Sequence, residues 1–430
     1  MPKHQKQNYK WIVFGVCFLM AFVSLGFCSG NKGLYLTPIT EALGIKRSLF
    51  SFNDSFRYVS TAVINLFFGS LIQRFGIRKM TAFGFVSLIA STLLYAYADH
   101  IVLFYLGGVL LGIGLSFTST TMASILIRRF FKTNVGKYTG IVLAANGIGG
   151  AVAAQLVSPL IESGPFGYRS SYLLVAIILF FTGVLAVALI REKPDNEEKE
   201  ETTPSQKKKS RGESWSGIDL RTAKTKSYFY LALISVFFTG CMLQAICGVY
   251  AAHMKDVGIS SSVVASVVSV FSLALTASKI LVGALYDRFG LRSVMLICQG
   301  ATVVSFLLLA VLNGSSVSIV FAFVFALVYA LALPLETLVL PLITNDLFGS
   351  LHYDRFLGIV VAMNYAGFAA GAPLVNLCYD LLGTYKPILL IFSVCVIPIA
   401  IAFQFVLGSV KKEKEAMLLE EKKTETYASK

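Results

Sequence analysis

The sequence is poor in charge and in the residue patterns of soluble catalytic sites. Only 14% of its 430 residues are charged and 56% are hydrophobic, whereas about a quarter of a typical soluble domain is charged. Its four histidines have no metal-ligand spacing, and neither an H-E-x-x-H motif nor a phosphate-binding loop occurs. These absences exclude an ordinary soluble enzyme and leave no catalytic constellation for an enzyme within a membrane, so no cofactor and no metal are expected.

Cysteine pairs and a cleavable leader are also missing. The seven cysteines all lie in apolar segments and none has C-x-x-C spacing, so we interpret them as small buried hydrophobic residues. The basic N-terminus precedes an apolar run without an A-x-A cleavage site. We interpret that run as a retained first helix.

What the sequence has in excess is long apolar runs, each long enough to cross a bilayer as a helix. We predict an all-α membrane protein with twelve transmembrane helices. They cover residues 11–35, 51–72, 80–98, 101–127, 138–160, 171–190, 227–252, 262–286, 294–312, 317–344, 357–378 and 387–408.

The net charge of +14 follows this topology. If the N-terminus is cytoplasmic, the inner segments carry 29 Lys and Arg and the outer loops carry 5. That asymmetry is the positive-inside pattern, so we expect both termini in the cytoplasm of a multi-pass plasma-membrane protein. The basic residues therefore indicate a lipid bilayer as partner and no nucleic acid.

A charged segment divides the chain in the middle. Residues 191–226 are rich in Lys and Glu and contain Pro194 and Pro204, which is typical of a solvated linker. We predict four units: an N-terminal six-helix bundle (1–190), a cytoplasmic linker (191–226), a C-terminal six-helix bundle (227–408) and a charged cytoplasmic tail (409–430).

The two bundles share short sequence repeats in the same order. Gly69–Arg78 matches Gly283–Arg292 at an offset of 214 residues, and Gly140–Asn146 matches Gly358–Asn364 at an offset of 218. Internal duplication of this kind is a common transporter plan, in which the substrate binds near the midplane between pseudo-symmetric repeats.

The first repeat resembles the G-x-x-x-D-R-x-G-x-R loop of the major facilitator superfamily. The copy at Gly283–Arg292 is complete, whereas the first copy has Gln73 where that family usually has Asp. The resemblance implies a cytoplasmic gate, with glycines that let helices approach closely; the alternative is that the arginines only anchor the topology. The gate residues would be Gly69, Arg74, Gly76, Arg78, Gly283, Asp287, Arg288, Gly290 and Arg292.

Further strings resemble the monocarboxylate and oxalate–formate porter branch of that superfamily. They are Phe22–Phe27 followed by Lys32, Phe130–Lys132 leading to Gly140 and Asn146–Gly149, and Asp346–Gly349 with Arg355–Gly358, Ala372-Pro373 and Tyr379–Tyr385. The branch typically has an arginine where this chain has Lys279. It also places an aspartate or a second lysine at positions that here hold Leu275 and Asn364.

Lys279 stands out because it interrupts an apolar stretch. A central lysine costs roughly 2.5–3.5 kcal/mol on membrane-insertion scales and usually faces a cavity, where it meets a partner or a ligand. Since no second midplane cation is visible near it, we favour a singly charged carboxylate as the ligand.

Five polar residues are expected at one depth. Lys279 lies eight residues before Asp287, which is about 12 Å along a helix. Similar counts put Asn65, Asn146, Asn364 and Glu336 near the middle of the membrane. The asparagines bind substrate or only join helices. Glu336 carries a coupling proton or merely neutralises Lys279, and Pro334 and Pro341 loosen its helix.

A second charged group lies nearer the outside. Asp54 and Arg57 are three residues apart on one helix and are spaced to pair. Lys32 either snorkels to the outer surface or joins Arg57 in attracting anions to an outward-open cavity. Asp54 is the second candidate for proton coupling.

The sequence therefore predicts a secondary active transporter of a small organic anion, with a monocarboxylate favoured. Transport would proceed by alternating access as proton symport or anion exchange, with Lys279, Asn146, Asn364, Asn65, Lys32 and Arg57 binding substrate. A monomer is expected. The alternatives are a transporter of a neutral or other small solute, with Lys279 paired to Glu336, and a non-transporting membrane sensor on the same fold.

Overall fold

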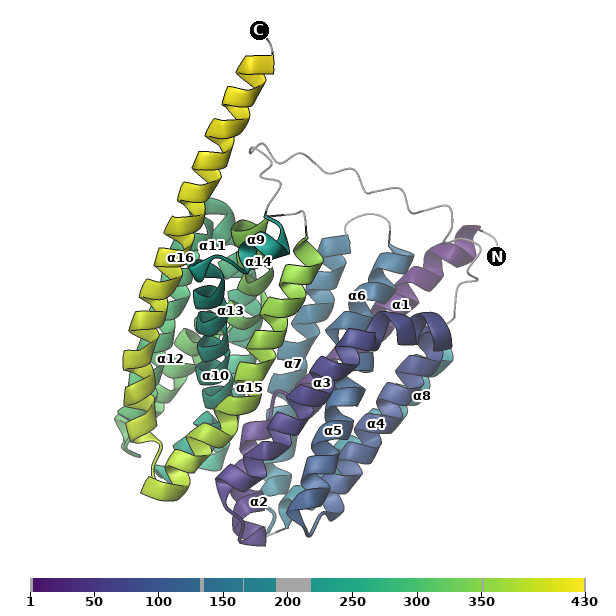
Figure 1. Ribbon diagram of the computed structural model, residues 1–430. Coiled ribbons are helices and arrows are strands. Elements are labelled where there is room, and N and C mark those ends of the chain that lie inside the picture. The colour runs from purple at the N-terminus through teal and green to yellow at the C-terminus, as the bar shows by residue number, and fades with distance from the viewer. Residues whose placement is uncertain (1–2, 132–134, 165, 191–217, 350–351, 429–430) are drawn as a thin grey trace.

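The computed structural model describes residues 3–131, 135–164, 166–190, 218–349 and 352–428. These residues form helices and connecting turns without a strand, arranged as two bundles side by side (Figure 1). The prediction of an all-α membrane fold is confirmed. Most of the predicted linker, residues 191–217, lies outside the described residues.

Each bundle consists of consecutive helices. The first contains α1 (Lys3–Cys28), the 3₁₀ turn η1 (Lys32–Leu34), α2 (Leu36–Leu43), α3 (Arg47–Phe75), α4 (Ile77–Tyr97), α5 (Ile101–Thr118), α6 (Thr120–Phe130), α7 (Val135–Ile161) and α8 (Gly167–Leu189). The second contains α9 (Leu220–Ala223), α10 (Ser227–Asp256), α11 (Ser261–Ala310), α12 (Ser316–Ala332), α13 (Pro334–Thr337), α14 (Val339–Phe348), α15 (Tyr353–Leu382) and α16 (Lys386–Ala428).

Eleven helices in the described ranges are long and apolar enough to cross a membrane. The longest, α11, has 50 residues and departs from helical geometry at Gly290, where φ is 74°. It therefore holds two of the twelve predicted spans. Gly76 separates α3 from α4 with a φ of 82°. Glycine adopts positive φ without steric cost, so the repeated motif places a turn-forming residue at the same point in both bundles.

The outward faces of the bundles are apolar. Large side chains such as Phe181 on α8 (67% exposed) and Val394 on α16 (64% exposed) point away from the protein interior. Helices satisfy their own backbone hydrogen bonds, so such faces are stable in hydrocarbon.

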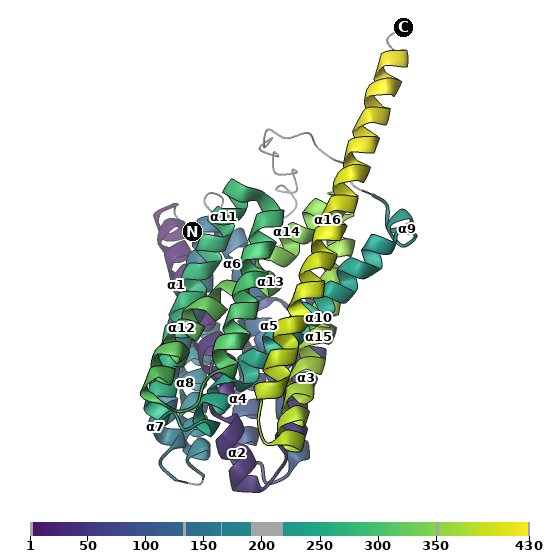
Figure 2. The same cartoon turned by 90° about the vertical axis from the view of Figure 1, so that its left-hand side faces the viewer.

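The beginning of α1 and the end of α16 lie at the same end of the molecule, here named the termini end (Figures 1 and 2). The opposite end, named the far end, contains α2, the start of α3 and the end of α15 (Figure 1). The halves contact each other through α3 with α15 and through α7 with α11.

Two predicted boundaries differ from the structure. Within the first candidate span, Tyr9–Leu34, the α-helix ends at Cys28 and Lys32 lies in the 3₁₀ turn η1. The last helix does not stop at residue 408, because α16 continues through the predicted tail to Ala428.

Candidate functional site

A cavity of about 320 Å³ lies between the two bundles, and both contribute to its wall. We call it the central cavity. Its polar lining residues are Ser29, Arg57, Tyr58, Thr61, Asn65, Ser116, Ser119, Thr121, Asn146, Gln244, Ser272, Lys279, Glu336, Thr337 and Tyr365. Leu25, Leu115, Phe271, Leu275, Leu333 and Phe368 supply much of the apolar wall.

Lys279 lines the central cavity from α11. Among the described residues, no hydrogen bond or ion pair engages its ammonium group. One turn before it, α11 packs closely against α7, because a Cβ placed on Gly147 of α7 would lie 2.0 Å from Oγ1 of Thr276. The structure therefore places an unpaired cation in the cavity, at a tight contact between the two halves.

The predicted polar layer is confirmed in part. Asn65, Asn146 and Glu336 line the same cavity as Lys279. Asn364 does not: it is buried in the interface between α15 and α10, where a Cβ on Gly240 would lie 2.5 Å from its Oδ1. Its neighbours on α15, Tyr365 and Phe368, face the cavity, and this turns Asn364 toward α10.

Glu336 lies on α13, a single turn between Pro334 and Thr337. The residue is 8% exposed, and its Oε1 has no hydrogen-bond partner among the described residues. No ion pair joins it to Lys279 in the described part of the chain. The expected loosening by proline is observed, because the tenth span is divided into α12, α13 and α14.

A charged cluster lies beside the cavity. Lys32 Nζ is 2.9 Å from Asp54 Oδ2, and Arg57 Nε is 3.6 Å from Asp54 Oδ1. The side chain of Lys32 is only 15% exposed, so it is held inside the protein and does not snorkel. The predicted pairing of Asp54 with Arg57 is found, but Asp54 also engages Lys32.

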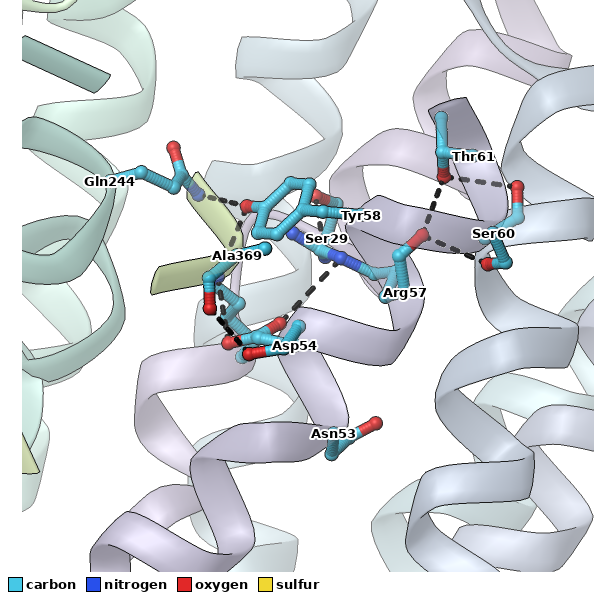
Figure 3. A network of polar contacts seen from close by, with 12 residues as sticks. Ser29, Asn53, Asp54, Arg57, Tyr58, Ser60, Thr61, Gln244 and Ala369 are labelled. Atoms are coloured by element: carbon cyan, nitrogen blue, oxygen red, sulfur yellow. Dashed lines mark hydrogen bonds and ion pairs between the residues drawn. The ribbon is translucent and has the colours of Figure 1, made fainter. Parts of the chain in front are cut away.

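Arg57 borders two spaces. It lines the central cavity and also a smaller cavity of about 50 Å³, which Lys32 and Asp54 share. Its Nη1 donates to Ser29 Oγ at 3.3 Å, and its guanidinium stacks over Tyr58 at 4.3 Å (Figure 3). Lys279 is therefore not the only cation that lines this cavity among the described residues, because Arg57 also lines it, with Asp54 as its counter-ion.

Tyr58 closes the cavity across the two halves. Gln244 of α10 donates a hydrogen bond to its hydroxyl, as Figure 3 shows. Its ring contacts Phe368 at 5.1 Å and Tyr365 at 6.1 Å between centroids. The sequence analysis missed both Tyr58 and Gln244, because a tyrosine or glutamine in an apolar run carries no motif.

Ser119 interrupts the fourth span. Its extended backbone (φ −99°, ψ −152°) separates α5 from α6, and both Ser119 and Thr121 line the cavity. The free N–H groups at the start of α6 therefore lie at the cavity wall, where they favour negative charge. Ser116 and Thr118 on α5 donate to carbonyls of their own helix.

Arg47 joins the halves at the far end. Its Nη2 donates to Asp256 Oδ1 at 2.8 Å, and its guanidinium stacks 3.9 Å over Tyr379. Asp380 accepts from the backbone N–H groups of Arg47 and Ser48 at the start of α3, at 3.1 and 2.9 Å. Arg47 was not among the residues singled out from the sequence. The aspartates at the ends of two other spans were the available signal.

The repeated motif lies at the termini end and makes contacts within each half. Arg78 Nε donates to Val187 O at 2.9 Å, and Arg292 Nε donates to Gln404 Oε1 at 2.7 Å. Neither of these two contacts joins the bundles. The expected close approach is also absent at Gly69, whose Cβ position is open. Polar contacts between the halves are found at the far end, as between Arg47 and Asp256, and beside the central cavity, as between Gln244 and Tyr58.

The described residues contain no group of three His, Cys, Asp or Glu side chains placed to hold a metal ion.

Comparison with known proteins agrees with the fold. The family profile of the Major Facilitator Superfamily matches residues 17–252 and 232–427. The uncharacterized MFS-type transporter YcxA of Bacillus subtilis (strain 168) is 27% identical over 290 residues, 67% of this chain and 67% of that protein.

Two further comparisons bear on the branch and on the fold. Monocarboxylate transporter 3 of Rattus norvegicus is 23% identical over 398 residues, 88% of this chain and 76% of that protein, which confirms the distant resemblance to monocarboxylate porters. The crystal structure of the nucleoside transporter NupG superposes with a TM-score of 0.73 at 15% identity, covering 93% of this chain and 99% of that one. The chain belongs to the Major Facilitator Superfamily, whose members are transporters and not enzymes.

Proposed function

We propose that this transporter moves a small organic anion, a monocarboxylate, and that Lys279 binds its carboxylate. The observation that carries the proposal is the unpaired ammonium of Lys279 in the central cavity. An uncompensated charge at membrane depth is costly, so a ligand of opposite charge stabilises the loaded site.

The surroundings of Lys279 support an anion. Asn146 and Asn65 line the same cavity and offer amide donors. The start of α6 adds partial positive charge to the wall. Asn364 is withdrawn from the proposed binding set, since it packs against α10.

The charge balance supports a single carboxylate. Arg57 and Lys279 are the cations that line the central cavity, and Glu336 is its lining acid. Arg57 has Asp54 as counter-ion, whereas the described residues offer none to Lys279. The alternative of a neutral solute with Lys279 paired to Glu336 loses support, because that ion pair is not formed.

Coupling has two candidate routes, proton symport and anion exchange. Asp54 is already engaged by Lys32 and Arg57. Glu336 has no ion pair in the described residues and is the stronger candidate for a transported proton. In anion exchange, Lys279 would be occupied in each crossing and no proton would be needed.

Alternating access follows from the two ends of the molecule. We place the termini end in the cytoplasm of the plasma membrane, as the distribution of Lys and Arg predicts. The far-end contacts then close the outside in this structure. The motif loops, including Asp287 and Arg292, would form the cytoplasmic gate in the opposite state.

The test is a panel of carboxylates added to the purified protein, with melting temperature as readout. Stabilisation of the wild type that is lost in Lys279→Gln supports both the substrate class and the site. Proteoliposome uptake then separates the couplings: acceleration by an inward proton gradient supports symport, and a requirement for a preloaded anion supports exchange. Binding without any uptake would instead support the sensor.

A further inference from the structure

Two side chains of opposite charge, Lys279 and Glu336, line the central cavity without forming an ion pair among the described residues. Lys279 has no hydrogen bond or ion pair within the described residues, and Oε1 of Glu336 is buried without a hydrogen-bond partner. Both line the one cavity, from α11 and α13 respectively. The proposed carboxylate contact at Lys279 leaves Glu336 unexplained.

The two groups do not neutralise each other. An ion pair would require an N–O distance of no more than about 4 Å, and none is formed between Lys279 and Glu336 in the residues described. Lys32 acts on Glu336 electrostatically, but its own ion pair is with Asp54 at 2.9 Å. The carboxyl of Glu336 is therefore left for something that enters the cavity.

A buried carboxylate without a partner is unstable unless it is protonated or meets a cation. We propose that the cation is part of the substrate, and that the transported molecule is an amino carboxylate whose ammonium meets Glu336 while its carboxylate meets Lys279. The inference rests on the proposed function for the Lys279 contact and adds the second charged group.

Symport of a plain carboxylate with a proton and uptake of an amino carboxylate alone bring the same net charge into the cavity. A plain carboxylate with one coupled proton enters the cavity with a net charge of zero, and so does a zwitterion. The ammonium group supplies the positive charge that the proton would otherwise bring to Glu336. An amino carboxylate therefore satisfies both side chains without proton coupling.

The cavity has room for such a ligand. Its volume of about 320 Å³ falls at the lower end of the range of ligand pockets, about 300–1,000 Å³. Aromatic rings of Phe271, Tyr365 and Phe368 form part of the wall, and such rings tolerate an ammonium group nearby.

The test compares matched ligands on the purified full-length protein. Alanine, β-alanine, 4-aminobutyrate and 6-aminohexanoate are titrated beside propionate, butyrate and hexanoate, with thermal stabilisation as the measure of affinity. The wild type is expected to bind at least one amino acid about tenfold or more tightly than its matched acid. The carbon-chain length of the preferred amino acid reports the separation between the charged groups of Lys279 and Glu336.

Variants assign the preference to Glu336. Glu336→Gln is expected to lose the tenfold preference for the amino acid over the plain acid, whereas Glu336→Asp retains part of it. Lys279→Gln is expected to weaken binding of both kinds of ligand. The melting temperature of each variant without ligand shows whether its fold is intact.

The possible failures are distinct. Wild-type protein that binds every plain acid as tightly as its amino counterpart overturns the inference and leaves the carboxylate proposal standing. Retention of the preference in Glu336→Gln overturns it as well. Failure of both series to bind the wild type contradicts the proposed function and this inference together. In proteoliposomes, amino-acid uptake that requires an inward proton gradient would also contradict it.

Discussion

The two ends of the molecule differ in whether the polar contacts described here join the two bundles or stay within one bundle. At the far end, Arg47 bonds to Asp256 and Asp380 accepts from the start of α3, so side chains of one bundle grip the other. At the termini end, Arg78 and Arg292 bond within their own bundles. The repeated motif is the clearest pattern in the sequence, yet closure here depends on residues that belong to no repeat. Arg47, Asp256 and Asp380 therefore join the bundles at the far end, and under the proposed alternating access the motif loops would act in the opposite state.

The largest effect is expected from removing the far-end contact. Arg47→Ala leaves Asp256 without its cation and removes the stacking on Tyr379. Breaking one partner of a buried pair costs about 3–5 kcal/mol. We expect about 2–4 kcal/mol here, because Asp256 keeps partial solvent access. The variant should have a lower melting temperature. Spin labels placed on either side of the far end should show a longer distance between the two bundles.

The adjacent exposed residue provides the control. Lys46 precedes Arg47 and is solvent-exposed, so Lys46→Ala should change neither quantity. If Arg47→Ala leaves the far-end distances unchanged and its melting matches Lys46→Ala, the network does not hold the halves together.

An intermediate effect is expected where α7 meets α11. A methyl group on Gly147 would lie 2.0 Å from Thr276 Oγ1 and 2.4 Å from Ser272 O. Overpacking of this kind costs typically about 1–3 kcal/mol. Gly147→Ala should therefore lower the melting temperature and weaken ligand binding, because the contact supports the wall beside Lys279. Gly140→Ala in the same helix meets open space and should have neither effect; equal behaviour of the two variants would refute the tight contact.

The smallest effect on stability is expected at the motif. Asp287 is exposed and belongs to the repeated motif at the termini end. Asp287→Asn should change stability by no more than about 0.5 kcal/mol, yet slow transport if the motif closes the opposite state. Uptake rate and melting temperature are measured together. Normal uptake by the variant would remove the motif from the gating account.

The sequence predicted the overall fold well, for clear physical reasons. Apolar length determines the spans, the Lys and Arg asymmetry suggests their direction, and the repeated motif aligns the bundles. Pro334 correctly indicated a break in the tenth span. Ser119 was harder, since a run of Ser and Thr is compatible with either a helix or a break until its surroundings are known.

The site was predicted less completely because residue counting gives depth and not rotation. Depth alone grouped Asn364 with Lys279, but the rotation of α15 places Asn364 against Gly240. Residue counting also does not show how far a long side chain reaches. Arg57 lies outside the predicted polar layer, yet it lines the central cavity. Partners distant in sequence, such as Arg47 with Asp256, carry no local pattern.

The central claim is that Lys279 binds the carboxylate of the transported substrate. The most direct measurement is uptake of a radiolabelled carboxylate or amino carboxylate that stabilises the wild type, into proteoliposomes containing wild type, Lys279→Gln or the exposed control Lys46→Gln. The account predicts that Lys279→Gln abolishes saturable uptake while the control transports normally and all three melt alike without ligand. Undiminished uptake by Lys279→Gln would contradict it.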